Sequence, residues 1–252
     1  MPKKLKFLLV CEGPTDIAFL KRLNEKIAGN LGTTIEIQEM SPQRDATSDS
    51  YPPHGWTGVR SWCKANRVKS ENEINSIDSP FKDLLRRKNW KALVSVANAD
   101  GLIVQMDTDI AEEIRDLPYR YTEHRGSRRD FCHEAVLYWM REEPSLDSNY
   151  YILLPTYALE TWLLAVHEPN ESVFDDLTKP FNYEELPDAE SRLLELGYQA
   201  KRNAHQGQRL KKKEIQYLEY ADKVYEKIAS VKERCREAHL FYDFLIKKNA
   251  AN

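Results

Sequence analysis

Two short apolar runs, far apart in the chain, each end in acidic residues. The run Leu5–Val10 is followed by Glu12, and the run Leu102–Met106 is followed by Asp107 and Asp109. Continuous runs of this length indicate strands that are buried on both faces, as in parallel sheets covered by helices. Ligands of open α/β sheets bind beyond the carboxyl ends of the strands. The sequence therefore predicts an acidic site at one edge of a parallel sheet.

Carboxylates gathered at one edge repel one another unless a cation neutralises them. Oxygen ligands of this kind suit Mg²⁺ or Mn²⁺, so we expect one of these ions as the cofactor. Taken singly, Glu12, Asp107 and Asp109 could each be an ordinary turn residue or an acid at a helix N-terminus. Their occurrence together behind two strands favours the site.

The order of the predicted elements indicates an α/β fold. A strand over Lys6–Cys11 precedes an amphipathic helix ending near Gly29, and Thr33–Met40 alternates as a second strand. This order begins a crossover unit of a parallel sheet. The later predicted elements are a helix from Ser79 to Val96, a strand over Gly101–Met106, a helix over Asp130–Arg141, a strand over Tyr150–Leu154 and a helix carrying Leu159 to Val166.

The residue composition and the hydrophobic pattern change along the chain and predict two regions. Residues 41–70 are rich in Ser, Pro, Asp and Gly, and we expect an irregular insertion there. No strand signal is recognisable beyond Pro169, where helical patterns dominate. We therefore predict a catalytic α/β domain over 1–170 and a helical lobe over 171–252.

Composition excludes several other classes of protein. The 252 residues are 41% hydrophobic and carry a net charge of −3, so a real core is expected without a whole-chain attraction to nucleic acid or membrane. Four cysteines without C-x-x-C spacing argue against a zinc knuckle or a disulfide framework. No stretch approaches the length of a membrane span. We expect a soluble, cytoplasmic protein with no membrane partner.

The acidic pattern resembles the Toprim domain of topoisomerases, bacterial primases and overcoming-lysogenization-defect nucleases. Glu12 matches the family's glutamate after its first strand, and Asp107 and Asp109 match its D-x-D motif. Asp16 matches an acid that nuclease members often carry in the same turn. The resemblance covers about residues 5–110. It implies a Rossmann-like, mainly parallel sheet, Mg²⁺ bound by these acids, and a glutamate acting as general acid or base on phosphodiester bonds.

A further similarity is to small stand-alone Toprim-like nucleases of bacterial restriction or anti-phage loci. These tend to carry an E-x-W-L-L helix, as in Glu160–Leu164, and a basic helical C-terminal segment like Lys211–His239. The similarity implies a role in anti-phage defence and a C-terminal lysine that assists catalysis. Many such proteins work beside a separately encoded ATPase, and this chain contains no phosphate-binding G-x-x-x-x-G-K-[ST] loop of its own.

One departure from the Toprim pattern concerns the metal ligands. Many members have a third acid two residues after the D-x-D motif, where this chain has Ala111. Either fewer groups hold a second metal, or Glu112, Glu113 or Glu160 supplies the missing ligand. Glu160 lies in the first turn of a helix that follows a strand, so it could face the same sheet edge. The alternative is a solvated helical glutamate.

Two basic segments are candidates for nucleic-acid binding, since arginine pairs bidentately with phosphate and tyrosine can stack on bases. In the loop after the D-x-D motif the candidates are Arg120, Arg125, Arg128 and Arg129, flanked by Tyr119 and Tyr121. In the C-terminal region they are Lys211, Lys212 and Lys213. Solvated surface charge is the alternative for each.

These observations together favour a metal-dependent nuclease acting on DNA or RNA. A haloacid-dehalogenase-like phosphatase is an alternative, because Met106–Asp109 resembles the D-x-D start of that class. That alternative leaves Glu12 without a role. A non-catalytic metal-binding regulatory module is a second alternative, which the missing third acid keeps open.

Overall fold

The apolar segments of the sequence form one parallel sheet. In the computed structural model, residues 3–76, 80, 82–144, 149–203 and 207–251 are described. The strands of this sheet run in the order β2-β1-β3-β4, and each neighbouring pair is parallel. Their bounds are β1 Lys3–Val10, β2 Thr33–Ser41, β3 Gly101–Gln105 and β4 Tyr150–Leu153. The predicted α/β class with a mainly parallel sheet is confirmed.

The strand order creates a switch point between β1 and β3. The chain passes from β1 to β2 on one side and later returns to β3 on the other side. At such a point the connections leave toward opposite faces, and a crevice opens beyond the carboxyl ends. Val10 is in register with Val104, so β1 and β3 end at the same level. Glu12 and Asp107 therefore both leave the sheet at this crevice.

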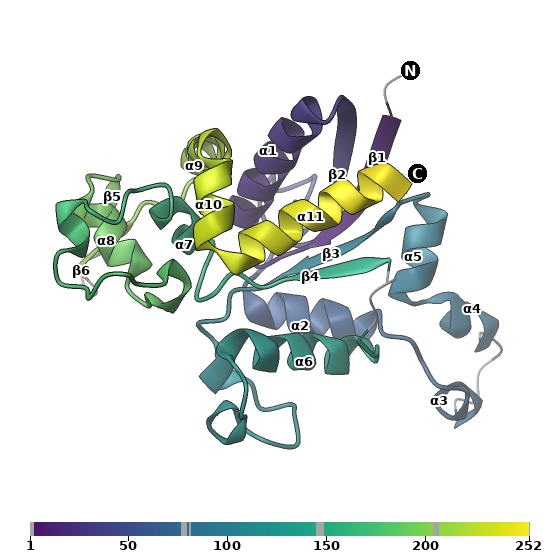
Figure 1. The fold of residues 1–252 in the computed structure, drawn as a ribbon. Coiled ribbons are helices and arrows are strands. Elements are labelled where there is room, and N and C mark those ends of the chain that lie inside the picture. The colour runs from purple at the N-terminus through teal and green to yellow at the C-terminus, as the bar shows by residue number, and fades with distance from the viewer. Residues whose placement is uncertain (1–2, 77–79, 81, 145–148, 204–206, 252) are drawn as a thin grey trace.

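Helices cover both faces of the sheet, as Figure 1 shows. On one face lie α1 (Pro14–Asn30), α9 (Glu214–Glu226) and α11 (Arg236–Ala251). On the other face lie α2 (Trp56–Ala65) and α6 (Arg128–Met140). The alternation of side chains along β1 explains the two layers, because each strand sends successive residues to opposite faces.

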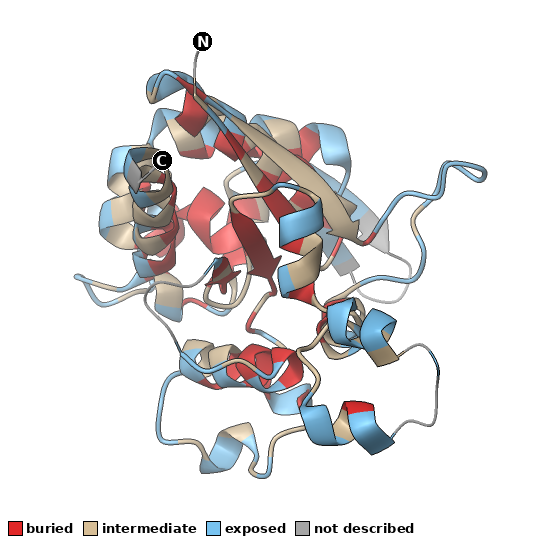
Figure 2. Ribbon diagram, turned by 90° about the vertical axis from the view of Figure 1, so that its right-hand side faces the viewer, coloured by how far each residue is buried: buried red, intermediate tan, exposed pale blue. Residues whose placement is uncertain are grey.

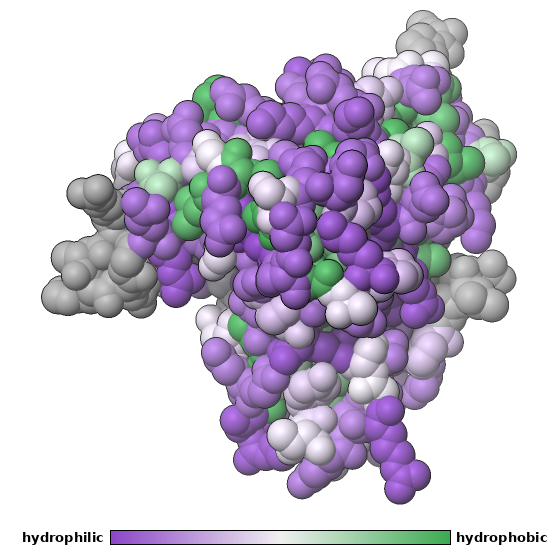
Figure 3. Space-filling view, turned by 60° about the vertical axis from the view of Figure 1, so that its left-hand side comes forward, coloured by the Kyte–Doolittle hydropathy of each residue, from purple (hydrophilic) through white to green (hydrophobic). Residues whose placement is uncertain are grey.

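Two hydrophobic clusters correspond to these two layers. Phe7 and Leu9 belong to the cluster on the α1 side, whereas Leu8 and Val10 belong to the cluster on the α6 side. Figure 2 shows the buried residues concentrated on the sheet and on the inner faces of the helices. The surface in Figure 3 is largely hydrophilic, with hydrophobic residues in small separate groups. No described helix is both long and apolar enough to cross a bilayer.

The remaining elements are short. The other helices are α3 Glu71–Ser76, α4 Lys82–Arg87, α5 Trp90–Val96, α7 Glu160–Leu164, α8 Ala189–Glu195 and α10 Ile228–Arg234, with single 3₁₀ turns at Ala111–Glu113, Tyr121–Glu123, Ser172–Phe174 and Tyr183–Glu185. An antiparallel pair, β5 Ala200–Asn203 and β6 Gly207–Leu210, forms a second small sheet.

Three element predictions need correction. Residues 41–70 are not wholly irregular, because they contain α2, whose Val59 and Cys63 are buried one turn apart. The helix predicted to reach Val96 is divided into α4 and α5, and Asn89 caps α5 by accepting a 3.0 Å hydrogen bond from the Ala92 N–H. Its predicted cap, Ser79, lies outside the described residues.

The third correction is the β5–β6 hairpin, which contradicts the prediction of no strand beyond Pro169. Its sequence is largely polar, and Leu210 of β6 joins the core. The region after residue 170 also contributes Tyr217, Ala221 and Phe241 to the cluster that contains Phe7. The predicted helical lobe therefore shares its hydrophobic core with the sheet.

Candidate functional site

Glu12 and Asp107 lie side by side at the switch point. The Asp107 N–H donates to the Glu12 carboxylate across 2.9 Å. Gln105, at the end of β3, joins both: its amide donates to Asp107 Oδ1 at 3.0 Å and its oxygen accepts from the Glu12 N–H at 3.3 Å. Gln105 was not predicted as a site residue, although a polar residue within the apolar run Leu102–Met106 could have indicated a functional role. The two strand exits are thus joined where the sequence predicts convergence.

The carboxylates of this site raise one another's pKa values by charge repulsion, and we call Glu12, Asp16, Asp107, Asp109 and Glu160 the acid group. Burial, with Asp16 and Asp109 nearby, raises the pKa of Glu12 from 4.5 to about 8, although the Asp107 N–H opposes this. Burial and the Glu160 carboxylate raise the pKa of Asp16 from 3.8 to about 7. Burial and Glu12 likewise hold the pKa of Asp107 well above its ordinary value. Each acid lies close enough to others to feel their charge.

Glu160 is buried and ion-paired rather than solvated. Its carboxylate lies 2.8 Å from Lys212 Nζ and accepts a hydrogen bond from the Tyr217 hydroxyl. Burial alone would raise the pKa of Glu160, but the Lys212 ammonium and the Tyr217 hydroxyl outweigh it, and the pKa lies below its ordinary value. The Lys212 pKa is raised, first by Glu160 and also by Asp107. The Lys212 ammonium therefore partly neutralises the negative charge of these carboxylates.

A cavity of about 470 Å³ is lined by Asp107, Glu160 and Lys212 among other residues, and we name it the acidic cavity. Asp109, which is exposed, lies in its wall. The other charged residues of its lining are Asp188, Glu190 and Arg209. The acidic cavity therefore combines carboxylates with two cations, one of which, Arg209, comes from the β5–β6 hairpin.

The turn that carries the D-x-D motif is tied to the turn after β4. The Thr108 and Asp109 N–H groups donate to the Tyr157 carbonyl at 3.0 and 3.2 Å. In return the Tyr157 N–H donates to the Thr108 hydroxyl at 2.8 Å. Tyr157 has a φ of 61°, a left-handed conformation that side chains rarely adopt. This exchange fixes Asp109 relative to the segment that leads to Glu160.

Arg128, a predicted nucleic-acid-binding residue, contacts the same turn. Its guanidinium donates to the Thr108 and Asp109 carbonyls at 3.1 and 3.2 Å. It also pairs with the Glu112 carboxylate, so Glu112 is not free to replace the missing third acid. The rings of Tyr121 and Tyr157 lie about 5 Å from the guanidinium carbon. Arg128 is therefore a positioning residue of the D-x-D turn.

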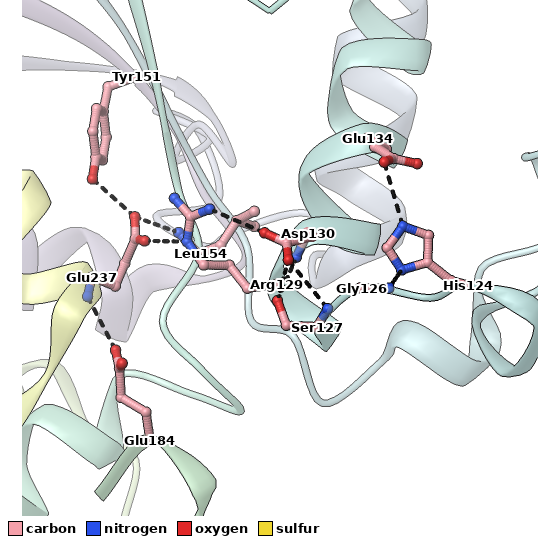
Figure 4. A network of polar contacts seen from close by, with 10 residues as sticks. All are labelled: His124, Gly126, Ser127, Arg129, Asp130, Glu134, Tyr151, Leu154, Glu184 and Glu237. Carbon is pink, nitrogen blue, oxygen red and sulfur yellow. Dashed lines mark hydrogen bonds and ion pairs between the residues drawn. The ribbon is translucent and has the colours of Figure 1, made fainter. Parts of the chain in front are cut away.

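Arg129, the neighbouring candidate, is paired inside the protein (Figure 4). It forms an ion pair with Glu237, which is fully buried on α11. The Tyr151 hydroxyl and the Leu154 N–H also donate to Glu237, at 2.9 and 3.3 Å. Burial raises the pKa of Glu237, and Arg129 opposes that shift. Arg129 thus joins α6 to α11 instead of presenting its charge to a ligand.

The other predicted cationic residues differ in their availability. Arg120, Arg125 and Lys213 are exposed. Lys211 is half-buried and donates to the Gln199 side chain at 3.2 Å. These four predicted nucleic-acid-binding residues have no buried ion-pair partner among the described residues, whereas Lys212 is paired with buried Glu160.

The acids have the right chemistry to bind a divalent cation, but they are not arranged as a complete set of metal ligands. Across the described ranges, no group of three or more His, Cys, Asp or Glu side chains is placed to hold a metal ion. Glu160 faces Lys212, and one Glu12 oxygen accepts the Asp107 N–H. The donors themselves are carboxylate oxygens with excess negative charge, as Mg²⁺ and Mn²⁺ prefer. The described acids therefore have the chemistry of a Mg²⁺ or Mn²⁺ site without its assembled geometry.

Comparisons with protein-family models, with curated proteins and with solved structures each found no match for this chain.

Proposed function

We propose that this protein is a divalent-metal-dependent nuclease that cleaves phosphodiester bonds in DNA or RNA. The observation that carries the proposal is the contact between Glu12 and Asp107 at the switch point. It brings together the two acidic motifs that resemble the Toprim pattern. Lys212 adds a cation to the acidic cavity, which Asp107 also lines, and phosphate approaches an acidic site more readily where a cation is present.

Glu12, Asp107 and Asp109, assisted by Asp16, would hold the Mg²⁺ or Mn²⁺ ion. A bound ion of this kind polarises the phosphate and lowers the pKa of a water molecule that attacks it. Lys212 would pair with a phosphate oxygen and stabilise the charge that develops during cleavage. Glu160 holds Lys212 in place, and Gln105 and Thr108 fix the turns that carry the acids.

A non-catalytic metal-binding regulatory module is the second candidate. It gives the same acids a role in holding a metal ion but requires no cleavage of the bound partner. The phosphatase alternative is weaker, because it gives no role to Glu12, whose carboxylate contacts the D-x-D motif directly.

A cleavage assay tests the proposal. We expect the wild type to cut DNA or RNA with Mg²⁺ or Mn²⁺, and Glu12→Gln and Asp107→Asn to lower the rate about 100-fold or more. Glu233→Gln, at an exposed position on α10, is the matched control and should leave the rate unchanged. Metal binding without cleavage would support the regulatory module. Hydrolysis of small phosphate esters that survives Glu12→Gln but not Asp107→Asn would support the phosphatase.

The metal-free protein is expected to lose thermal stability between about pH 5 and pH 8. Burial and neighbouring acids raise the pKa of Glu12 to about 8 and that of Asp16 to about 7. A carboxyl group with a raised pKa in the folded state stabilises the fold fully below its unfolded pKa. That contribution is lost as pH rises through the folded pKa. Thermal unfolding in EDTA across this range measures the loss, and Glu12→Gln should flatten the curve.

Added Mg²⁺ should raise the melting temperature more at pH 8 than at pH 6, because carboxylate ligands bind metal only when deprotonated. Glu12→Gln should reduce the difference. An equal shift at both pH values in the wild type would show that these acids do not hold the ion.

A further inference from the structure

A second cavity, of about 230 Å³, is lined by Glu12, which does not line the acidic cavity. Glu12 follows β1, which is the strand between β2 and β3. The acidic cavity lies toward β3 and β4, whereas the second cavity lies between the exits of β1 and β2 and the start of α2. We name it the proline cavity, and its lining is Cys11, Glu12, Met40, Ser41, Pro42, Gln43, Pro52, Pro53, His54, Gly55 and Gly58.

The two cavities differ in chemistry. No lysine or arginine contributes to the lining of the proline cavity, all of which lies within the described residues, and Glu12 is its one carboxylate. Proline rings, the Met40 thioether and the His54 imidazole supply flat or soft apolar surface. Ser41 and Gln43 add hydrogen-bonding groups. Such a lining suits an uncharged flat ring better than a phosphate group.

The size of the proline cavity points to part of a ligand. Cavities that enclose a whole small-molecule ligand measure about 300–1,000 Å³. A cavity of about 230 Å³ is smaller, so it fits one ring system that projects from a larger ligand. A nucleobase attached to a nucleic-acid strand has this character.

The floor of the proline cavity is fixed by backbone contacts. The Gly55 N–H donates to the Glu12 carbonyl at 2.7 Å, and the Cys11 N–H donates to the Ser41 carbonyl at 2.8 Å. A Cβ added to Gly13 would lie 3.4 Å from His54 Nδ1, so the imidazole lies against this glycine. His54 is otherwise exposed, and an imidazole supported on one side can stack a base on the other.

We propose that the proline cavity binds the base of a nucleotide next to the scissile phosphate, with His54 as its stacking partner. This inference rests on the proposed nuclease function. Glu12 belongs to the acid group and also lines the proline cavity. A phosphate held against Glu12 and Asp107 therefore has a neighbouring base within reach of the proline cavity. Ser41 and Gln43 would contact the edge of that base and give the enzyme a base preference at one position.

Single-stranded oligonucleotides with one abasic residue test the inference. The residue is moved stepwise through the sequence, in DNA or RNA according to which the wild type cleaves. We expect kcat/KM to fall about 5- to 100-fold when the abasic residue occupies one position beside the cleaved bond, as for loss of one stacked base. His54→Ala should cause a similar fall on the intact strand, with no further fall from the abasic residue.

His239→Ala, at an exposed histidine on α11 outside both cavities, is the control and should keep the wild-type pattern. Binding of the same strands in EDTA, followed by fluorescence anisotropy, gives a readout that does not depend on cleavage. Here too the abasic residue and His54→Ala should weaken binding of the wild type without adding to each other. Equal cleavage and binding for every abasic position would overturn the base site and leave the nuclease function standing. Absence of both binding and cleavage for all strands would overturn both.

Discussion

Replacing Lys212 with methionine is expected to lower the rate of phosphodiester cleavage about 100-fold or more, the usual effect of removing one group that stabilises developing charge. Lys212 Nζ lies 2.8 Å from buried Glu160, and its charge also reaches Asp107 and Asp16. Without it, the acidic cavity would repel the phosphate, and Glu160 would become a buried carboxylate without its cation. Steady-state cleavage with Mg²⁺ measures the effect on kcat/KM.

Two further variants separate the catalytic role of Lys212 from a structural role. Lys212→Met combined with Glu160→Gln removes the unpaired buried carboxylate, so thermal stability should recover while cleavage stays low. Lys227→Met is the matched control, because Lys227 is exposed and lies outside both cavities, and it should behave like the wild type. Recovery of cleavage in the double variant would show that Lys212 acts only by neutralising Glu160.

The parallel sheet and the meeting of the two acidic motifs could be predicted because both follow from local patterns. Continuous apolar runs identify β1 and β3, and parallel neighbours end at the same sheet edge. The position of Glu12 beside Asp107 then follows from strand order alone. The strand order itself, in which β1 is the neighbour of β3, was not predicted and is a finding of the structure.

Which charged side chains are exposed and which are ion-paired could not be predicted, because the pairing depends on residues far away in the sequence. Arg125 and Arg129 look equivalent in the loop sequence, yet Arg125 is exposed and Arg129 pairs with a glutamate 108 residues away. Lys212 is likewise one of three consecutive lysines, and only the position of Glu160 distinguishes it. The β5–β6 hairpin was missed for a related reason, since its polar sequence carries no alternating apolar pattern.

Arg129→Met is expected to lower the free energy of unfolding by about 3–5 kcal/mol, the usual cost of breaking a buried ion pair. The substitution leaves Glu237, which is fully buried, without its cation. For a chain of this size we expect a fall of about 10 °C in the melting temperature. Thermal or urea unfolding measures it.

Arg125→Met provides the matched control, because Arg125 lies in the same loop but is exposed, and its effect on stability should be small. Arg129→Met combined with Glu237→Leu removes both buried charges and should regain most of the lost stability. One outcome would contradict this prediction. If Arg129→Met unfolds like the wild type but binds nucleic acid more weakly, its charge serves a phosphate, as its position in the basic loop suggests, and the ion pair with Glu237 contributes little to the fold.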